Sequence, residues 1–94
     1  MMLHLEQFII DRITQFRLQM RLTQKELGKI IKVSASFISN VENPRSTAKY
    51  NLRHIALLSE NFRLKPVFFL LTASEYAKID PDYNESGIFP VPIY

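Results

Sequence analysis

Residues 22–43 carry the strongest structural signals in this chain, and they read LTQKELGKIIKVSASFISNVEN. Thr23 lies three residues before Glu26, which is the capping-box pattern that begins a helix, and Leu22 can pack against Leu27 as a hydrophobic staple. Ser34 is a second N-cap candidate, because apolar residues follow it at helical spacing, namely Phe37, Ile38 and Val41. The pattern predicts a helix over residues 24–31 and a second over residues 34–42.

The sequence on both sides of this stretch also predicts helices. Apolar residues at spacings of four, three and four predict a helix before it, with Ile9, Ile13, Phe16 and Met20 on one face. Asn43-Pro44 ends the helix over residues 34–42, because the residue before a proline avoids the α region. A stripe over residues 52–62 predicts a fourth helix, and Pro66 suits the first turn of a short fifth one. The fold class that follows is all-α, a five-helix domain with a short non-helical C-terminal tail.

The composition excludes several classes of protein. The 94 residues make one domain, with no cysteine and two histidines, so neither a disulfide scaffold nor a metal centre is expected. No serine–histidine–aspartate arrangement and no glycine-rich phosphate loop is present, so we expect no enzyme activity and no cofactor. The apolar runs are too short to span a membrane, and Asp11 and Arg12 interrupt the pattern of a signal peptide. We therefore expect a cytoplasmic protein with no membrane partner.

The charges are distributed unevenly along the chain. Residues 12–53 contain nine lysines and arginines against two acids, Glu26 and Glu42, so their net charge is 9 − 2 = +7. Residues 66–94 contain Lys78 against four acids, which gives 1 − 4 = −3. A basic body with an acidic tail predicts a polyanion as the partner of the body.

Two short helices joined by about three residues have the helix-turn-helix arrangement. The runs LTQKELG at residues 22–28 and VSASFISNVEN at residues 33–43 carry a resemblance to a known family. Residues 9–71 resemble the DNA-binding domain of the lambda-repressor-like, xenobiotic-response-element (XRE) family. The resemblance implies a helix-turn-helix domain over residues 1–71 that binds double-stranded DNA sequence-specifically. It would act as a transcriptional regulator, a repressor rather than an activator, with the helix over residues 34–42 in the major groove.

The resemblance also implies roles for individual residues. It assigns contacts with DNA bases to Ser34, Ala35, Ser36, Ser39 and Asn40. Among these, Asn40 is suited to bidentate pairing with adenine. Phosphate contacts fall to Thr23, Gln24, Asn43, Arg45 and Lys49. Arg17 and Glu42 match a buried structural ion pair of the family, and Gly28 is expected where two helices cross closely.

The chain departs from the family where glycine is usual, at Arg21, Lys32, Pro44 and Arg63. A cation near a helix C-terminus favours the helix dipole, but its Cβ disfavours the left-handed backbone that glycine adopts. Val67 and Phe68 stand where the family has polar residues, so they are expected to be covered, either in a homodimer or by the chain's own tail.

The acidic C-terminal tail, residues 72–94, leaves two functions open. Small XRE proteins are often antitoxins, and the tail would then neutralise a toxin protein, whereas a stand-alone regulator needs no such partner. Pro90 and Pro92 would block one edge of an extended segment and leave the other edge free to pair. The tail is therefore predicted to be an interaction strand, because its last seven residues include Ile88, Phe89, Val91, Ile93 and Tyr94.

Overall fold

The structure, a computed structural model, describes residues 2–79, apart from the side chain of Ala73. Its helices are α1 (His4–Gln19), α2 (Gln24–Ile31), α3 (Ala35–Glu42), α4 (Leu52–Phe62), the 3-10 helix η1 (Pro66–Leu70) and α5 (Ala73–Ala77). The described range contains no β-strand, so the predicted all-α fold is confirmed there. The predicted interaction strand lies outside the described residues.

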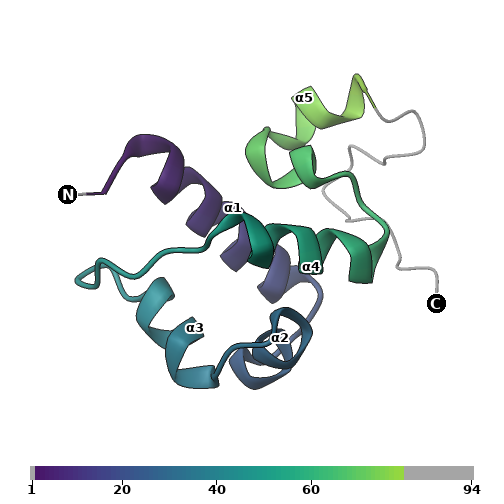
Figure 1. Cartoon of the computed structure of the whole chain (residues 1–94). Coiled ribbons are helices and arrows are strands. Elements are labelled where there is room, and N and C mark those ends of the chain that lie inside the picture. The colour runs from purple at the N-terminus through teal and green to yellow at the C-terminus, as the bar shows by residue number, and fades with distance from the viewer. Residues whose placement is uncertain (1, 80–94) are drawn as a thin grey trace.

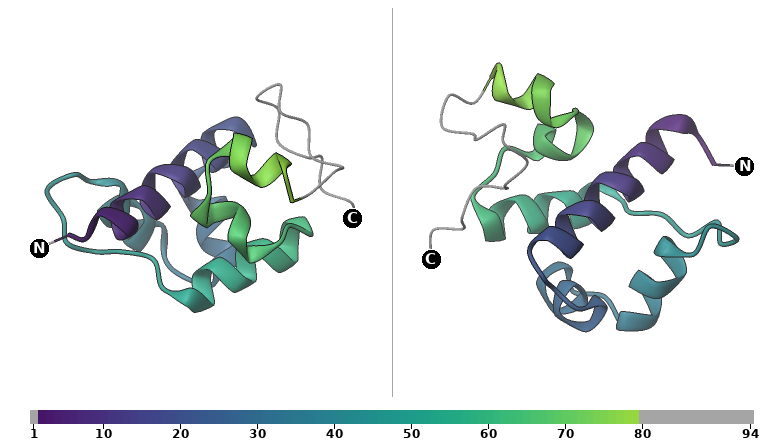
Figure 2. Two further views of the ribbon diagram at one scale, coloured as in Figure 1. Left: turned by 90° about the horizontal axis from the view of Figure 1, so that it is seen from above. Right: turned by 180° about the vertical axis from the view of Figure 1, so that it is seen from behind.

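α1 and α4 form the middle of the molecule, and the other helices pack at its two ends (Figure 1). α2 and α3 pack against each other, while α2 also contacts α4 and α3 contacts α1. At the opposite end η1 contacts both α1 and α4, and α5 packs on η1. The view from behind shows the same separation of the helix-turn-helix pair from η1 and α5 (Figure 2).

Phe16 lies at the centre of the hydrophobic core and is fully buried. Its ring makes edge-to-face contacts with three aromatic rings, at centroid distances of 4.9 Å to Phe62, 5.9 Å to Phe68 and 5.4 Å to Phe69. Aromatic pairs of this geometry stabilise a core beyond the burial of their area. A single residue of α1 thereby joins α4 to η1.

Both predicted N-caps of the helix-turn-helix begin their helices. The Thr23 hydroxyl accepts a hydrogen bond from Glu26 N at 3.0 Å, and Glu26 Oε1 accepts one from Thr23 N at 2.8 Å. The Ser34 hydroxyl accepts a hydrogen bond from Phe37 N at 3.0 Å. These bonds satisfy backbone N–H groups that have no partner inside the helix, and so they fix where α2 and α3 start.

The C-terminal end of the described chain differs from the expectation. The predicted fifth helix is the 3-10 helix η1, and a further helix, α5, follows it. Thr72 caps α5, because its hydroxyl accepts a hydrogen bond from Glu75 N at 3.2 Å. Tyr76 is fully buried, with its ring centroid 4.8 Å from that of Phe68. The helical body therefore continues past residue 71, after which the sequence predicted the tail.

Three residues other than glycine hold the left-handed backbone conformation, with φ values of 57° at Arg21, 62° at Lys32 and 54° at Arg63. Lys32 and Arg63 directly follow α2 and α4, and Arg21 follows the last turn of α1. These are three of the positions where the resemblance leads one to expect glycine. The left-handed region costs a residue with a Cβ about 1–2 kcal/mol, so the chain carries a cation at each site despite that cost.

Gly28 is required by the turn that joins α2 to α3. A Cβ at this position would lie 2.6 Å from the carbonyl oxygen of Val33, which is backbone and cannot rotate away. The same turn is closed by a hydrogen bond of 2.8 Å from Val33 N to the carbonyl oxygen of Gly28. The expectation that two helices cross at Gly28 is therefore corrected, because the close neighbour is the turn between them.

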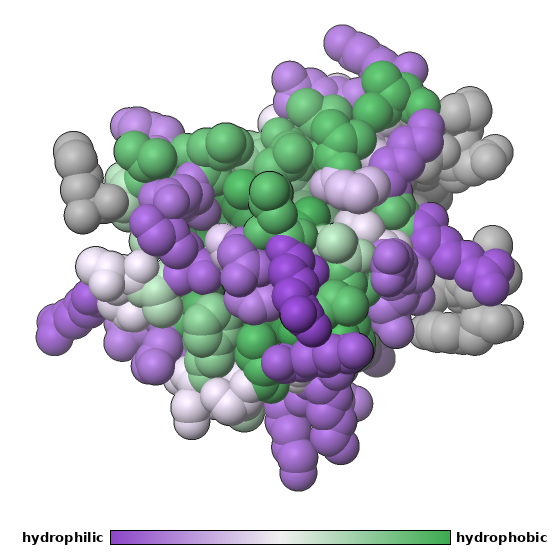
Figure 3. Space-filling view, viewed as in Figure 1, coloured by the Kyte–Doolittle hydropathy of each residue, from purple (hydrophilic) through white to green (hydrophobic). Residues whose placement is uncertain are grey.

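Hydrophobic and hydrophilic side chains are segregated on the surface (Figure 3). Hydrophobic side chains gather along the upper part of the face in view, over α1 and η1. Hydrophilic side chains gather at the bottom, over α2. On this face, the most hydrophilic surface therefore lies over α2 of the helix-turn-helix.

Candidate nucleic-acid interface

The recognition face is the exposed side of α3 and its cap, formed by Ser34, Ala35, Ser36, Ser39 and Asn40, all of which are exposed. On the opposite side of α3, Ile38 and Val41 are buried in the core. The Ser34 hydroxyl caps α3, so it is already partly engaged. The side chains of Ser36, Ser39 and Asn40 make no hydrogen bond to any other residue within the described range, and so they are available to a ligand.

The predicted ion pair between Arg17 and Glu42 is confirmed. Arg17 Nε donates to Glu42 Oε2 at 2.7 Å, and Arg17 Nη2 donates to Glu42 Oε1 at 2.8 Å. Both side chains are largely buried, at 12% and 11% exposure. Arg17 Nη1 also donates to the carbonyl oxygen of Leu22 at 2.9 Å, so the pair joins the end of α1 to the end of α3 and to the start of the helix-turn-helix.

Gln24, a predicted phosphate contact, belongs to the same network. Its Nε2 donates to Glu42 Oε1 at 3.0 Å. An amide nitrogen carries two N–H groups, so the second N–H of Gln24 can still donate to a phosphate while the first is held by Glu42. Gln24 is also the first residue of α2, where free backbone N–H groups and the helix dipole favour an anion.

Asn43 and Arg45 lie in the loop after α3. Asn43 Oδ1 accepts a hydrogen bond from Arg45 N at 3.0 Å, and the carbonyl oxygen of Asn43 accepts one from Ser46 N at 3.0 Å. The side-chain oxygen of Asn43 therefore closes a turn around Pro44, and its Nδ2 is the group left to donate to a phosphate. Arg45 is exposed.

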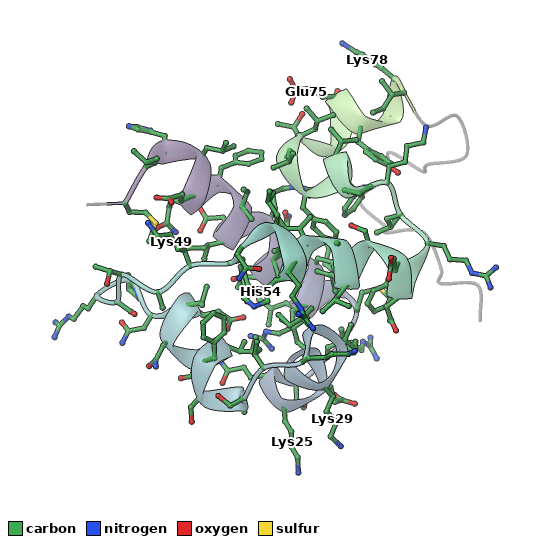
Figure 4. The ribbon with its side chains drawn as sticks, in the orientation of Figure 1. Lys25, Lys29, Lys49, His54, Glu75 and Lys78 are labelled. Carbon is green, nitrogen blue, oxygen red and sulfur yellow. The ribbon has the colours of Figure 1, made fainter. Side chains whose placement is uncertain are left out.

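Lys49, a predicted phosphate contact, is paired with an acid in the structure. Its Nζ lies 2.9 Å from Glu6 Oε2, and its side chain lies beside the N-terminal half of α1 (Figure 4). The carboxylate of Glu6 also accepts a hydrogen bond from Leu3 N at 3.0 Å. The Leu3 N–H and the Lys49 ammonium together hold the pKa of Glu6 below its usual range. This ion pair ties the loop to α1, and the phosphate contact of Lys49 stays a prediction.

The nine cations of residues 12–53 do not all reach the surface. Arg12 is 7% exposed, its Nη2 donates to the carbonyl oxygen of Phe68 at 2.8 Å, and its guanidinium lies 4.6 Å from the centroid of the Phe68 ring. Arg17 and Lys49 are paired with acids. Six cations are exposed and make no salt bridge within the described residues, and they are Arg21, Lys25, Lys29, Lys32, Arg45 and Arg53.

Two buried residues beneath the recognition face were missed. His54 lies against Phe37 of α3 at 5.2 Å between ring centroids, and Tyr50 lies 5.9 Å from His54. His54 Nδ1 accepts a hydrogen bond from Asn51 N at 3.1 Å, and Asn51 Oδ1 accepts one from His54 N at 3.0 Å. Burial, and then the charge of Arg53, lower the pKa of His54. The spacing Asn51-x-x-His54 was the available signal, since it is an N-cap followed by a polar residue three positions later.

The Tyr50 side chain is 8% exposed, and its hydroxyl has no hydrogen-bond partner among the described residues. Burial raises the pKa of Tyr50, so the hydroxyl stays protonated at neutral pH. Its ring lies 6.3 Å from that of Phe37. Tyr50 and His54 therefore support α3 from the side opposite the recognition face.

Of the two coverings predicted for Val67 and Phe68, the structure contains the one by the chain's own C-terminal segment for Phe68, whereas the homodimer stays a prediction. Phe68 is fully buried by its own chain, between Phe16 and Tyr76, so it offers no surface to a partner. Val67 is partly buried, and Leu70 of the same helix is 37% exposed. Phe68 was predicted to be covered, and the structure shows that α1 and α5 cover it.

No family model matches the sequence, and neither a curated protein nor a solved structure matches it. Among residues 2–79, no helix has the length and apolar character that crossing a membrane requires.

Proposed function

We propose that this protein binds double-stranded DNA sequence-specifically, with α3 in the major groove, and acts as a cytoplasmic transcriptional regulator. The observation that carries the proposal is the recognition face, an exposed row of short polar side chains whose helix is fixed from behind by buried residues. A helix of this kind suits the major groove, because its residues can approach base edges closely while the core keeps its position.

The groups around this helix support the same proposal. Gln24 stands at the start of α2 with one amide N–H held by Glu42, which orients the other for a phosphate oxygen. Six exposed cations without a salt bridge lie in residues 12–53, and two of them, Lys25 and Lys29, extend outward from α2 (Figure 4). Phosphate contacts give affinity and position, whereas base contacts give specificity. We expect a repressor rather than an activator.

The test begins with selection of duplexes from a random DNA pool at a fixed salt concentration. If about 6–10 phosphates are contacted, affinity for the selected duplex should fall by ~10³–10⁵ between 50 and 200 mM salt. Affinity that does not depend on salt, or a pool that yields no preferred sequence, contradicts the proposal.

Two substitutions separate the two kinds of contact. Asn40→Ala should relax the preference at one base pair of each site, at a cost of about 1–3 kcal/mol there. Gln24→Ala should weaken binding to every sequence alike. Asn61→Ala is the matched control, because Asn61 is an exposed asparagine of α4. An unchanged sequence preference for Asn40→Ala would show that α3 does not read bases.

The proposal includes a homodimer, for which η1 offers the partly buried Val67 and the exposed Leu70. Two copies would bind half-sites about 34–36 Å apart, and the footprint would be palindromic. A toxin-binding role depends on the C-terminal tail, most of which lies outside the described residues. No observation therefore favours the antitoxin function over that of a stand-alone regulator.

A further inference from the structure

Three lysines recur along one side of α2. Lys25, Lys29 and Lys32 are separated by four and three residues, so their Cα atoms follow one face of the helix. All three are exposed, and Figure 4 shows Lys25 and Lys29 leaving α2 on the same side, away from the other helices. We call these residues the lysine stripe.

The stripe is not neutralised by the protein. The salt bridges of the described residues are Arg17 with Glu42 and Lys49 with Glu6, and neither involves the stripe. Glu26 is the acid nearest to it along α2, and its carboxylate is held by Thr23 N, although the Lys29 charge still lowers the pKa of Glu26. Like charges four residues apart on a helix repel each other, so the folded protein retains Lys25 and Lys29 against that repulsion.

The backbone conformation of Lys32 is a second energetic cost that the stripe carries. Its φ of 62° is a conformation that glycine adopts without steric hindrance. Arg21 and Arg63 hold the same conformation, so the position of Lys32 beside the recognition face, together with the strain, points to a function for its side chain. Lys32 lies two residues before Ser34, so the stripe ends where the recognition face begins.

We propose that the lysine stripe binds the phosphate backbone of DNA next to the groove that α3 occupies, which rests on the proposed function. The stripe extends the interface from the recognition face along α2. Its ammonium groups act as point charges that release counterions from the duplex, and they add affinity without sequence preference.

Lys32→Gly tests the proposal, because it removes the charge and the strain together. Affinity for the selected duplex should fall about eightfold at 0.1 M salt, since the salt dependence should lose ~0.9 from its slope. The melting temperature should rise by about 2–4 °C, because glycine relieves the left-handed backbone. A merely structural role for Lys32 would move stability and affinity in the same direction.

Arg63→Gly is the matched control. Arg63 is the left-handed cation after α4, outside the stripe, and its replacement should raise the melting temperature while affinity stays within about twofold. Lys25→Gln with Lys29→Gln should remove about two from the slope, whereas Arg63→Gln with Lys78→Gln should leave it unchanged.

Equal losses of affinity from the stripe variants and from their controls would overturn the proposal, because they would reflect net charge alone. Unchanged affinity in the stripe variants would also overturn it, while salt-dependent binding by the wild type would leave the proposed function standing. If the wild type binds no DNA, the proposed function fails and the stripe proposal with it. Binding of polyglutamate by the wild type and not by the Lys25–Lys29 variant would assign the stripe to an acidic protein instead.

Discussion

Gly28 shows how a single side chain would disturb the proposed site. The turn between α2 and α3 approaches this residue so closely that the carbonyl oxygen of Val33 occupies the space of a Cβ. Because that oxygen belongs to the backbone that leads into α3, any shift that makes room also moves the recognition face.

Gly28→Ala should lower the free energy of unfolding by about 1–2 kcal/mol, because the steric cost exceeds the gain in helix propensity. Urea denaturation measures this change. Lys29→Ala is the control, since the next residue of α2 is exposed and its replacement should stay within about 0.5 kcal/mol. Equal stability of the two variants would mean that the turn yields without cost.

At the scale of residues, contacts that belong to a family motif could be predicted, whereas contacts between distant residues outside the motif could not. The pair of Arg17 and Glu42 followed from the resemblance, and the structure contains it at 2.7 Å. Lys49 and Arg12 could not be assigned from charge counts, because their partners, Glu6 and the carbonyl oxygen of Phe68, are 43 and 56 residues away. A count of charges treats every cation as exposed and unpaired, whereas three of the nine are buried or paired with an acid in the folded protein.

At the scale of elements, both ends of α2, α3 and α4 were predicted to within one residue, whereas the helices after residue 65 were not. Thr23 and Ser34 cap α2 and α3 through their own side chains, so a pattern of three or four residues contains the whole signal. Helices α2 and α4 end one residue before Lys32 and Arg63. These two residues adopt the left-handed backbone that is usual for glycine. The 3-10 geometry of η1 depends on packing against α1 and α4, which no local pattern records. The start of α5 did have a local signal, the capping box of Thr72 and Glu75, which was missed.

The start of α4 carries a group whose protonation changes stability. Neutral His54 accepts a hydrogen bond from Asn51 N through Nδ1, and protonation would convert this acceptor into a donor. Because the folded protein has a lowered pKa at His54, the unfolded chain binds the proton more readily. The stabilisation from His54 is therefore present above the unfolded pKa of about 6.5 and is lost as the pH falls through the folded pKa.

His54→Gln should reduce the loss of stability between pH 7 and pH 5, because glutamine can take the same position in a capping box without titrating in that range. Thermal denaturation at a series of pH values measures the effect. His4→Gln serves as the control, because His4 is exposed. A profile in which both variants keep the wild-type pH dependence would remove His54 as its source.

At the scale of the whole molecule, the core is shared between distant parts of the chain. Phe16 of α1, Phe68 of η1 and Tyr76 of α5 are all fully buried and in contact through their rings. The five-helix, all-α arrangement could be predicted from helical periodicity, whereas the role of Tyr76 could not, because it depends on α5 folding back on η1.

Tyr76→Ala should lower the free energy of unfolding by about 3–5 kcal/mol, because it leaves a cavity beside Phe68. Tyr76→Phe should cost less than Tyr76→Ala, because it keeps the buried ring and removes only the hydroxyl, which accepts a hydrogen bond of 3.4 Å from Lys65 N. Denaturant titration of both variants separates the contribution of the ring from that of the hydroxyl. A small effect of Tyr76→Ala would mean that α5 contributes little to the domain.

The division of α3 into two faces has an evolutionary consequence. Ile38, Val41 and Glu42 hold the helix in place, whereas Ser36, Ser39 and Asn40 take no part in the core or in the Arg17–Glu42 network. Exchanges on the outward face should change stability by only about 0.5 kcal/mol or less, which a small domain can tolerate. A descendant of this chain could therefore acquire a new binding preference by single substitutions while its folding remains unaltered.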